Sequence, residues 1–338
     1  MTETTSSPHV DRRTALKALA AAGAGVLTLG LSANGQAAER DDRLQNALSR
    51  FGVDARKKLT GLLNSSSFSG QIPAATIADV MASDHQTIEE VMLGLVPVAQ
   101  LYSHPPISDY HVGAVARGKS GDLYLGFNIE MPGQGLGYAV HGEQAACSSA
   151  YMHGEQGIEI VAVNGAPCGH CRQFMNEFAP DGNLQVIAGA AGAMKLSSLL
   201  PLAFGPKNLG RTEGAVPVRE MKLELARRDI DPAIEAAFDA AQKSYAPYSS
   251  SHSGVAIATR LGRIYRGSYI ENVAFNPSLP PLQTALVQMI VAGEEYSAIV
   301  RVVLVEAAAK ITQKPATEAV AAAIARGVKV EVFSARGA

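Results

Sequence analysis

A faint internal repeat restricts the folds open to this chain of 338 residues more than any other feature. Five residues of the first half recur in the second half at one constant offset, without a gap. The first-half residues are Pro106, Ser108, Gly113, Gly126 and Glu130, and their counterparts are Pro247, Ser249, Gly254, Gly267 and Glu271. A match of this kind predicts that one fold is used twice along the chain.

The pattern of apolar residues predicts strands that alternate with helices in both copies. The strands expected in the first copy are 112–116, 122–126 and 158–163, and those expected in the second are 255–258, 264–266, 299–305 and 328–333. Such alternation indicates an α/β fold in which helices and sheets form layers.

Composition and periodicity divide the chain into five expected parts. Apolar residues at helical spacing predict an N-terminal helical segment. The parts are a leader at 1–39, the helical segment at 40–95, a first α/β domain at 96–195, a linker at 196–222 and a second domain at 223–338.

Two short segments of the first copy carry residues that bind metals. His141-Gly142-Glu143 supplies an imidazole and a carboxylate, and Pro167-Cys168-Gly169-His170-Cys171 supplies two thiols. One histidine and two cysteines are three ligands for zinc, which leaves a fourth position open for water. At the start of a helix, a Cys-x-x-Cys directs both sulfurs at one metal, and the helix terminus partly offsets the thiolate charge. We therefore predict one zinc per chain on His141, Cys168 and Cys171.

Glu143 is expected on the first turn of a helix, where it can face the activated water without binding the metal. A carboxylate placed there can take a proton from the water and pass it on. Taken alone, a Cys-x-x-Cys is also compatible with a structural zinc half-site or a redox pair. The only other cysteine, Cys147, excludes a four-cysteine site, and a redox pair would not explain the upstream His-x-Glu. The combined H-x-E and P-C-x-x-C pattern is known from zinc nucleobase deaminases.

The second copy lacks these ligands. With one deletion allowed, His141-Gly142-Glu143-Gln144 falls opposite Pro281-Leu282-Gln283-Thr284. The second copy then has no equivalent histidine or glutamate, and it has no Cys-x-x-Cys. We predict that it keeps the fold, has lost the metal, and leaves one active site per chain.

Asn128 and Glu130 follow a strand-like run, and residues two apart on a strand project to the same face. An amide and a carboxylate in this arrangement can hydrogen-bond a sugar hydroxyl. The spacing alone is also compatible with a turn-and-strand pair that serves solubility.

Several segments around these residues resemble the cytidine deaminase family, in particular its larger, two-domain homodimeric form. They are 110–114, 128–130, 141–144 and 167–177, and the likeness extends from about residue 40 to the C-terminus, including 200–207 and 274–283. The resemblance implies a duplicated, three-layer cytidine-deaminase-like fold. It also implies hydrolytic deamination of cytidine and deoxycytidine to the uridines, with release of ammonia, in pyrimidine salvage.

The resemblance assigns a role to each matching position. Zinc is assigned to His141, Cys168 and Cys171, proton transfer during hydroxide attack on C4 to Glu143, the ribose contact to Asn128 and Glu130, and aromatic contacts to Tyr110 and to Phe204 of a partner subunit. The chain departs from the family at two places. Tyr110 stands where phenylalanine is expected, and Gly142 stands where alanine or valine is usual. Neither departure removes a ligand, but both can alter affinity.

Charge and composition narrow the class of substrate. The net charge is −2, 47% of the residues are apolar, and no basic patch is interleaved with aromatic residues. This argues against a deaminase that acts on RNA or DNA and favours a small nucleoside. Two alternatives stay open: a deaminase of the same fold for guanine, a nucleotide or a tRNA adenosine, and a non-catalytic zinc protein. A carboxylate at Glu130 would repel a 5′-phosphate, and a structural zinc would not need Glu143.

Residues 1–39 resemble a twin-arginine export signal. Arg12 and Arg13 precede an apolar stretch of about fourteen residues, from Ala18 to Leu31, which is too short for a membrane span. We therefore expect a periplasmic protein with no stable membrane association after removal of the leader. The alternative is a cytoplasmic protein whose start lies further downstream. Export in the folded state would put zinc on the cysteines before an oxidising compartment could join them.

Three further residues are expected outside the ligand set. His170 should point away from the metal although it lies within the Cys-x-x-Cys. His153 should be a surface group or a support for the site, and Cys147 a thiol packed in the core.

Overall fold

The computed structural model describes residues 33–226 and 231–337. The chain divides into two compact units, Met1–Asp42 and Arg43–Ala338. In the first unit the described residues form the beginning of helix α2 (Ala33–Ala47). The predicted leader signal, with Arg12 and Arg13, lies outside the described residues. Within the described ranges, no helix is long and apolar enough to cross a membrane.

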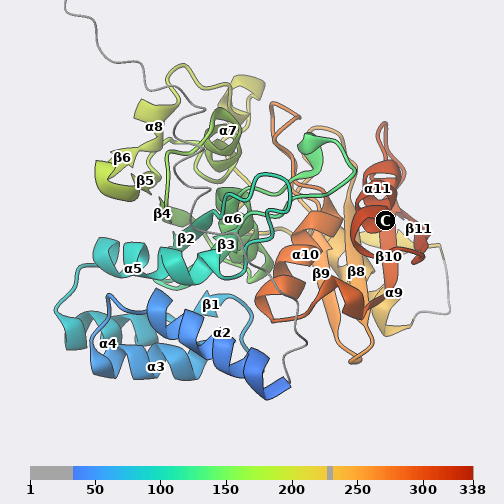
Figure 1. Cartoon of the computed structure of the whole chain (residues 1–338). Helices are drawn as coiled ribbons and strands as arrows, with labels where there is room; N and C mark the ends of the chain where they lie inside the picture. Colours follow the sequence, from blue (N-terminus) through green and yellow to red (C-terminus); the bar gives the residue numbers. More distant parts are fainter. Residues whose placement is uncertain (1–32, 227–230, 338) are drawn as a thin grey trace, which may run out of the picture. The chain divides into compact units, whose positions relative to one another are not determined.

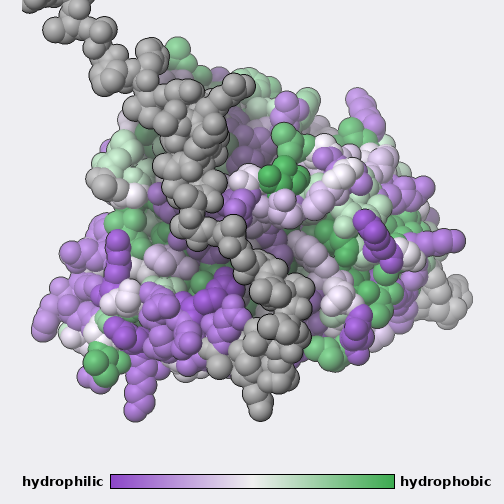
Figure 2. Space-filling model, in the orientation of Figure 1, coloured by the Kyte–Doolittle hydropathy of each residue, from purple (hydrophilic) through white to green (hydrophobic). Residues whose placement is uncertain are grey.

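Helices dominate the N-terminal part of the second unit. They are α3 (Val53–Leu63), α4 (Ala74–Asp84) and α5 (Ile88–Gln100), with the short strand β1 (Gln71–Ile72) between the first two. On α3 the buried residues Ala55, Leu59 and Leu63 recur every fourth position, so that helix buries one stripe. The outward-facing surface over α3 and α4 is covered by hydrophilic side chains (Figure 2). Helix α5 crosses the boundary expected at residue 95 and packs on the sheet of the first copy.

The first copy contains a six-stranded sheet with the order β1-β3-β2-β4-β5-β6. Its further elements are β2 (Gly113–Gly118), β3 (Leu123–Phe127), α6 (Gly142–Met152), β4 (Ile158–Val163), α7 (Gly169–Phe178), β5 (Gln185–Ala188), β6 (Ala193–Lys195) and α8 (Leu196–Leu199). Strand β2 pairs antiparallel with β3 and β4, and β4 pairs parallel with β5.

The second copy repeats this arrangement in a five-stranded sheet with the order β7-β11-β10-β8-β9 (Figure 1). Its elements are β7 (Leu223–Leu225), α9 (Pro232–Gln242), β8 (Ser253–Thr259), β9 (Ile264–Ser268), α10 (Pro281–Val291), β10 (Ile299–Ala307), α11 (Lys314–Ile324) and β11 (Val330–Gly337). Strand β8 pairs antiparallel with β9 and β10, and β10 pairs parallel with β11. The sequence β3-β2-β4-β5 therefore has the same order and directions as β9-β8-β10-β11, which confirms the predicted duplication.

Two repeated glycines fix the correspondence between the copies and correct one predicted alignment. A Cβ on Gly126 would lie 2.4 Å from the carbonyl oxygen of Gly142, and a Cβ on Gly267 would lie 2.3 Å from that of Pro281. Each glycine thus lets a helix approach its strand closely, α6 in one copy and α10 in the other. Gly142 therefore corresponds to Pro281, and His141 corresponds to Pro280, one residue earlier than predicted.

The loop before the helix is two residues shorter in the second copy, whereas the alignment from sequence assumed a deletion of one residue. This difference explains the correction. Glu143 corresponds to Leu282, and Gln144 corresponds to Gln283. The conclusion drawn from the sequence is unchanged, because neither Pro280 nor Leu282 can bind a metal through its side chain.

The opposite face of each sheet is covered by another helix. A Cβ on Gly113 would lie 2.4 Å from the carbonyl oxygen of Val96 in α5, and a Cβ on Gly254 would lie 2.4 Å from that of Ala237 in α9. Because neighbouring strand residues face opposite sides, α5 and α6 lie on opposite faces of the first sheet. Each copy therefore has the expected three layers, helix on sheet on helix.

One hydrophobic core joins the two copies. Buried residues of α6, such as Cys147 and Ala150, belong to the same core as Leu286 and Val287 of α10, and the two helices are in contact (Figure 1). The predicted linker also folds onto the first copy: the backbone N–H of Ala215 donates to the carbonyl of Glu177 at 2.9 Å.

Candidate active site

The predicted metal ligands lie at the N-termini of two neighbouring helices. His141 is the N-cap residue of α6, and Glu143 lies on the first turn of that helix. Cys168 is the N-cap residue of α7, and Cys171 lies one turn later. The expected positions of Glu143 and of the Cys-x-x-Cys at helix starts are therefore both found in the fold.

The three ligand side chains converge in a geometry that fits zinc. One ring nitrogen of His141 and the sulfurs of Cys168 and Cys171 all lie within 4.8 Å of one another. The Cys168 sulfur lies 3.5 Å from His141 Nδ1 and 3.6 Å from the Cys171 sulfur. Tetrahedral zinc with bonds of about 2.3 Å to sulfur and about 2.0 Å to nitrogen would separate these atoms by about 3.5 Å and about 3.8 Å. The donor set and its spacing therefore fit one zinc ion.

The ligand thiols differ in their affinity for protons. Hydrogen bonds from Cys171 and His141 lower the pKa of Cys168 to about 3, which favours its thiolate. The neighbouring Cys168 and burial both raise the pKa of Cys171, and the hydrogen bond to Cys168 raises the pKa of His141. Because zinc binds thiolates and neutral imidazole, zinc uptake would release the protons that these two groups hold.

Glu143 lies beside the ligand group without belonging to it. Its Oε2 lies 3.3 Å from the Cys171 sulfur, and the residue is only 4% exposed. Burial raises the pKa of Glu143 above its ordinary value. A carboxyl group with a raised pKa next to an open metal position is suited to accept and return a proton.

Asn128 and Glu130 lie just beyond the end of β3. They flank Ile129, which makes isolated bridges to His104 and Val140. The amide of Asn128 accepts from the Val112 N–H and donates to the Tyr110 carbonyl, both at 2.9 Å. Glu130 accepts from the backbone N–H groups of residues 107 and 108, in the loop that Asn128 also binds. The two side chains therefore face the same side, as predicted.

Hydrogen bonds keep Glu130 ionised. Burial opposes ionisation, but donors from Ser108 and from the backbone of Ile107 outweigh it and lower the pKa of Glu130. A carboxylate can accept about four hydrogen bonds, and Glu130 accepts three from the residues that the structure describes, at 2.5, 2.8 and 2.9 Å. One acceptor position is thus left for a hydroxyl donor.

The two aromatic residues assigned by resemblance lie on exposed loops. Tyr110 is 59% exposed, and its backbone is held by Asn128 and Ser108. Phe204 is 47% exposed, and its carbonyl accepts from Gln173 of α7 at 2.8 Å. Neither side chain belongs to the ligand group, and the contact of Phe204 with a partner subunit stays a prediction.

The remaining sequence predictions concern residues near the ligands. His170 stacks its ring on His141 at a centroid distance of 5.1 Å and is not in the ligand group. His153 binds Ser69 Oγ at 2.9 Å at the far end of α6. Cys147 is fully buried, and burial raises its pKa, as expected for a packed thiol.

Two further residues support the candidate ligands. They lie within segments 141–144 and 167–177, and their role was not predicted from the sequence. Gln144 accepts from the backbone N–H of His141 at 3.2 Å. Arg172 donates to the carbonyls of Pro167 and Leu199 at 2.9 and 2.8 Å, which fixes the turn before Cys168. A Gln three residues after the N-cap of a helix commonly accepts from the N-cap backbone N–H, so this bond of Gln144 could have been predicted from the sequence.

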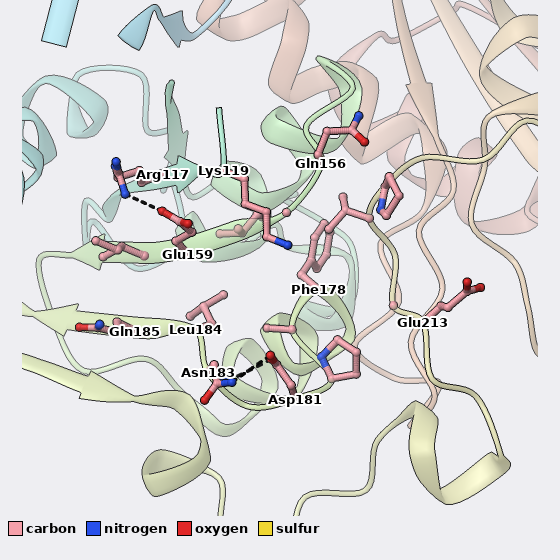
Figure 3. A pocket seen from close by; sticks show the side chains of 18 of the residues that line it. Arg117, Lys119, Gln156, Glu159, Phe178, Asp181, Asn183, Leu184, Gln185 and Glu213 are labelled. Carbon is pink, nitrogen blue, oxygen red and sulfur yellow. Dashed lines mark hydrogen bonds and ion pairs between the residues drawn. The ribbon is translucent and has the colours of Figure 1, made fainter. Parts of the chain in front are cut away.

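A separate pocket lies near the C-terminal end of α7 (Figure 3). It has a volume of about 870 Å³, and its lining includes Lys119, Phe178 and the ion pair of Arg117 with Glu159 at 2.5 Å. None of the predicted site residues lines it. The candidate active site is therefore the ligand group at the helix N-termini and not this pocket.

A duplicated α/β fold with one three-ligand metal site and an adjacent buried carboxylate defines a zinc-dependent hydrolase of the deaminase class. The family described as "Cytidine and deoxycytidylate deaminase zinc-binding region" matches twice, at residues 85–186 and 196–318. The second match covers the copy in which the structure, within its described residues, places no group of metal ligands.

Similar proteins cover most of the chain. A cytidine deaminase from Shewanella pealeana is 41% identical over 265 residues, which are 78% of this chain and 88% of the relative. A cytidine deaminase from Vibrio vulnificus is 39% identical over 293 residues, which are 86% and 99%. The crystal structure of cytidine deaminase from Mycobacterium tuberculosis is 25% identical, covers 36% of this chain and 99% of its own, and has a TM-score of 0.33. The chain belongs to the cytidine deaminase family, in its two-domain form.

Proposed function

We propose that the protein hydrolyses cytidine and deoxycytidine to uridine and deoxyuridine with release of ammonia. The observation that carries this proposal is the convergence of His141, Cys168 and Cys171 beside the buried carboxylate of Glu143. The relatives that match most of the chain are named cytidine deaminases, so deaminases of guanine, nucleotides or tRNA adenosine are not favoured. A role in pyrimidine salvage would follow from the uridine product.

The ligand residues would hold one zinc ion, which supplies Lewis-acid activation of water. Glu143 takes the proton of the attacking water and delivers it to N3 of the pyrimidine as the C4–O bond forms. Glu143 then carries the second proton to the amino group on C4. The C4–N bond breaks, ammonia leaves and the C4 carbonyl of uridine remains. Burial of Glu143 supports this role because it brings the pKa of the carboxyl group closer to neutral pH.

The sugar would bind at the loop held by Asn128 and Glu130. The Asn128 amide has a second N–H, and Glu130 has one free acceptor position, so the pair can bind one ribose hydroxyl as donor and acceptor. A negative charge at Glu130 disfavours nucleotides with a 5′-phosphate nearby. Tyr110 would lie beside the pyrimidine.

The decisive experiment compares the purified protein with its Glu143→Gln variant on a panel of nucleosides, nucleotides and free bases. Ammonia release should be fastest with cytidine and deoxycytidine. The variant should keep about one zinc per chain and lose about 10²–10⁴-fold in kcat. Near-normal turnover with zinc retained would refute the assigned proton transfer, and loss of zinc would make Glu143 a ligand.

We further propose that the active protein is a homodimer with shared active sites. Large apolar side chains are exposed on loops that bind site elements, where a second chain would cover them. They include Ile107 beside Glu130, Phe204 beside Gln173, and Phe275, exposed to 50%, 47% and 67%. Burial of these side chains against a second copy would complete the pyrimidine pocket.

Export to the periplasm is a separate proposal that rests on Arg12 and Arg13 and the apolar stretch after them. Changing both arginines to lysine should leave the full-length chain in the cytoplasm, as measured by cell fractionation. Unchanged chains found in the cytoplasm with their start near Arg40 would contradict this proposal.

A further inference from the structure

A loop of the second copy touches both helices that carry the predicted zinc ligands. This bracing loop, residues 272–279, connects β9 to α10 and contains Asn272, Val273 and Pro277. It is rigid in itself, because Asn272 accepts from the Ala274 N–H at 3.0 Å and its own N–H donates to Ser278 Oγ at 2.9 Å. The loop therefore has a defined shape with which to hold other elements.

On the side of α6, the bracing loop acts through Gln144. This amide is 1% exposed and makes one hydrogen bond in each direction. Its Oε1 accepts from the backbone N–H of His141 at 3.2 Å, and its Nε2 donates to the carbonyl of Pro277 at 3.0 Å. Gln144 thus links the backbone of a predicted zinc ligand directly to the second copy.

On the side of α7, the bracing loop acts through Gln173 and Glu177. Asn272 Nδ2 donates to the carbonyl of Gln173 at 2.9 Å. The fully buried Glu177 accepts from the Val273 N–H at 3.0 Å and from the Tyr245 hydroxyl at 2.7 Å. All three donors belong to the second copy, and the helix that they hold begins with Cys168 and Cys171.

We propose that the bracing loop of the metal-free copy sets the geometry of the zinc site, with Gln144 as the positioning residue that holds His141. The loop binds α6 and α7 independently, so it fixes the distance between the imidazole on one helix and the two sulfurs on the other. The second copy, which has no metal ligands of its own, would thus support the zinc site of the first copy. The inference rests on the proposed function only for its turnover readout.

The repeat supplies a matched control. Gln283 of α10 corresponds to Gln144 of α6, and it is equally buried, at 1% exposed. Its Oε1 has no hydrogen-bond partner in the part of the chain that the structure describes. Replacing either glutamine by methionine keeps an unbranched side chain of similar length and removes the amide. Gln144→Met therefore breaks the link to the zinc site, whereas Gln283→Met removes an equally buried amide that has no such link.

The experiment measures zinc and cobalt binding to Gln144→Met, Gln283→Met and the unchanged protein. Loss of a partner that orients a ligand costs about 10–100-fold in metal affinity or activity. Gln144→Met should therefore lose about 10–100-fold in zinc affinity, measured by competition with a chelator, and should change the visible spectrum of the cobalt-substituted protein. Its kcat for cytidine should fall with little change in KM, because Asn128 and Glu130 lie on another segment.

Gln283→Met should match the unchanged protein in all three measurements. If Gln144→Met does not fold, Glu177→Gln serves as the second variant, because it keeps the shape of the side chain but leaves one acceptor oxygen where the carboxylate uses two, one for Tyr245 and one for Val273. Wild-type zinc affinity and cobalt spectrum in the folded variants, or equal losses in Gln144→Met and Gln283→Met, would overturn the proposal. The metal readouts do not depend on cytidine turnover, so a wrong substrate assignment would be recognised separately.

Discussion

At position 142 the chain has glycine, and the space that a larger residue would need is occupied by Val112. A Cβ on Gly142 would lie 2.7 Å from Cγ1 of Val112 and 3.6 Å from Cβ of Ala114. The departure from the family at this position therefore has a local cause. Val112 is itself fixed, because its N–H donates to Asn128, so its shift would reach the sugar-binding loop.

We predict that Gly142→Ala lowers both stability and cytidine turnover. Overpacking costs about 1–3 kcal/mol, which exceeds the gain of about 0.5–1 kcal/mol from replacing glycine in a helix. Adding Val112→Ala should restore part of the loss, because the smaller residue makes room for the new methyl group. Chemical denaturation of the single and double variants measures this coupling. Strictly additive changes in the free energy of unfolding would show that the two side chains do not compete.

The residues of the candidate metal site could be predicted from sequence because their spacing is local. His141 and Glu143 are two apart, Cys168 and Cys171 are three apart, and helix starts orient each pair. The support of these residues could not be predicted in the same way. Gln144 binds Pro277, which is 133 positions away, and no periodicity connects such partners.

At the scale of elements, Glu155 connects the end of α6 to the hairpin of β2 and β3. Its carboxylate accepts from the hydroxyls of Ser120 and Tyr124 and from the N–H of Gln156 at 2.7 Å. Burial opposes ionisation, but these hydrogen bonds lower the pKa of Glu155 below its ordinary value. A lowered pKa means that the ionised carboxylate stabilises the folded state.

We predict that Glu155→Gln lowers the free energy of unfolding by about 1–3 kcal/mol at pH 7, the usual contribution of hydrogen bonds to a charged group. The contribution of Glu155 is fully present above the ordinary carboxyl pKa of about 4.3 and is lost as the pH falls through its lower folded value. The difference between variant and unchanged protein should therefore shrink below about pH 4. Urea denaturation from pH 3 to 7 measures this.

The control for this series is Glu159→Gln on β4, where an exposed carboxylate pairs with Arg117. A surface ion pair contributes about 0–1 kcal/mol, so the free energy of unfolding of this variant should differ little from that of the unchanged protein across the whole pH range. A constant difference for Glu155→Gln across the pH range would assign its effect to packing.

Elements could be predicted from sequence where they are long and regular. The seven expected strands are all found within a few residues of their predicted ends, because each carries a run of apolar or β-branched residues. The strands β1, β5, β6 and β7 were missed, and they have only two to four residues. The predicted alignment of His141 with Pro281 was wrong by one residue because loop lengths leave no periodic signal, and the close contact of Gly267 with Pro281 corrects it.

At the scale of the whole molecule, the second copy has filled the space where the first copy has its site. Tyr269 corresponds to Asn128 and is 4% exposed, with its hydroxyl 3.4 Å from Glu271. Leu282 is fully buried at the position of Glu143, and Gln313 is the N-cap residue of α11 as Cys168 is of α7. All three residues are buried, and among the described residues of the second copy there is no set of metal ligands.

We predict that zinc titration saturates near one ion per chain. Cys168→Ser should reduce the tightly bound zinc to well below one, because a hydroxyl is a poor substitute for a thiolate ligand. Metal analysis after dialysis measures both quantities, and circular dichroism confirms that the variant is folded. Two zinc ions in the unchanged protein, or one retained in folded Cys168→Ser, would contradict the loss of metal from the second copy.

The proposed shared site would make activity depend on a second chain. Phe204 lies in the segment between the copies, flanked by Pro201 and Pro206, and it is 47% exposed. Its backbone is tied to Gln173 of α7, so the segment is anchored while the ring is available. The competing interpretation is an aromatic residue that only anchors the segment.

Mixing two inactive variants separates these interpretations. Glu143→Gln chains lack proton transfer, and Phe204→Ala chains keep an intact zinc site but lack the aromatic contact. If Phe204 acts across the interface, a mixed dimer pairs the intact zinc site of one chain with Phe204 of the other. Activity should then rise above both parents, to at most half of the unchanged dimer, as one of its two sites is complete. Mixed dimers, proven by mass spectrometry, that show no rise would place Phe204 in its own subunit.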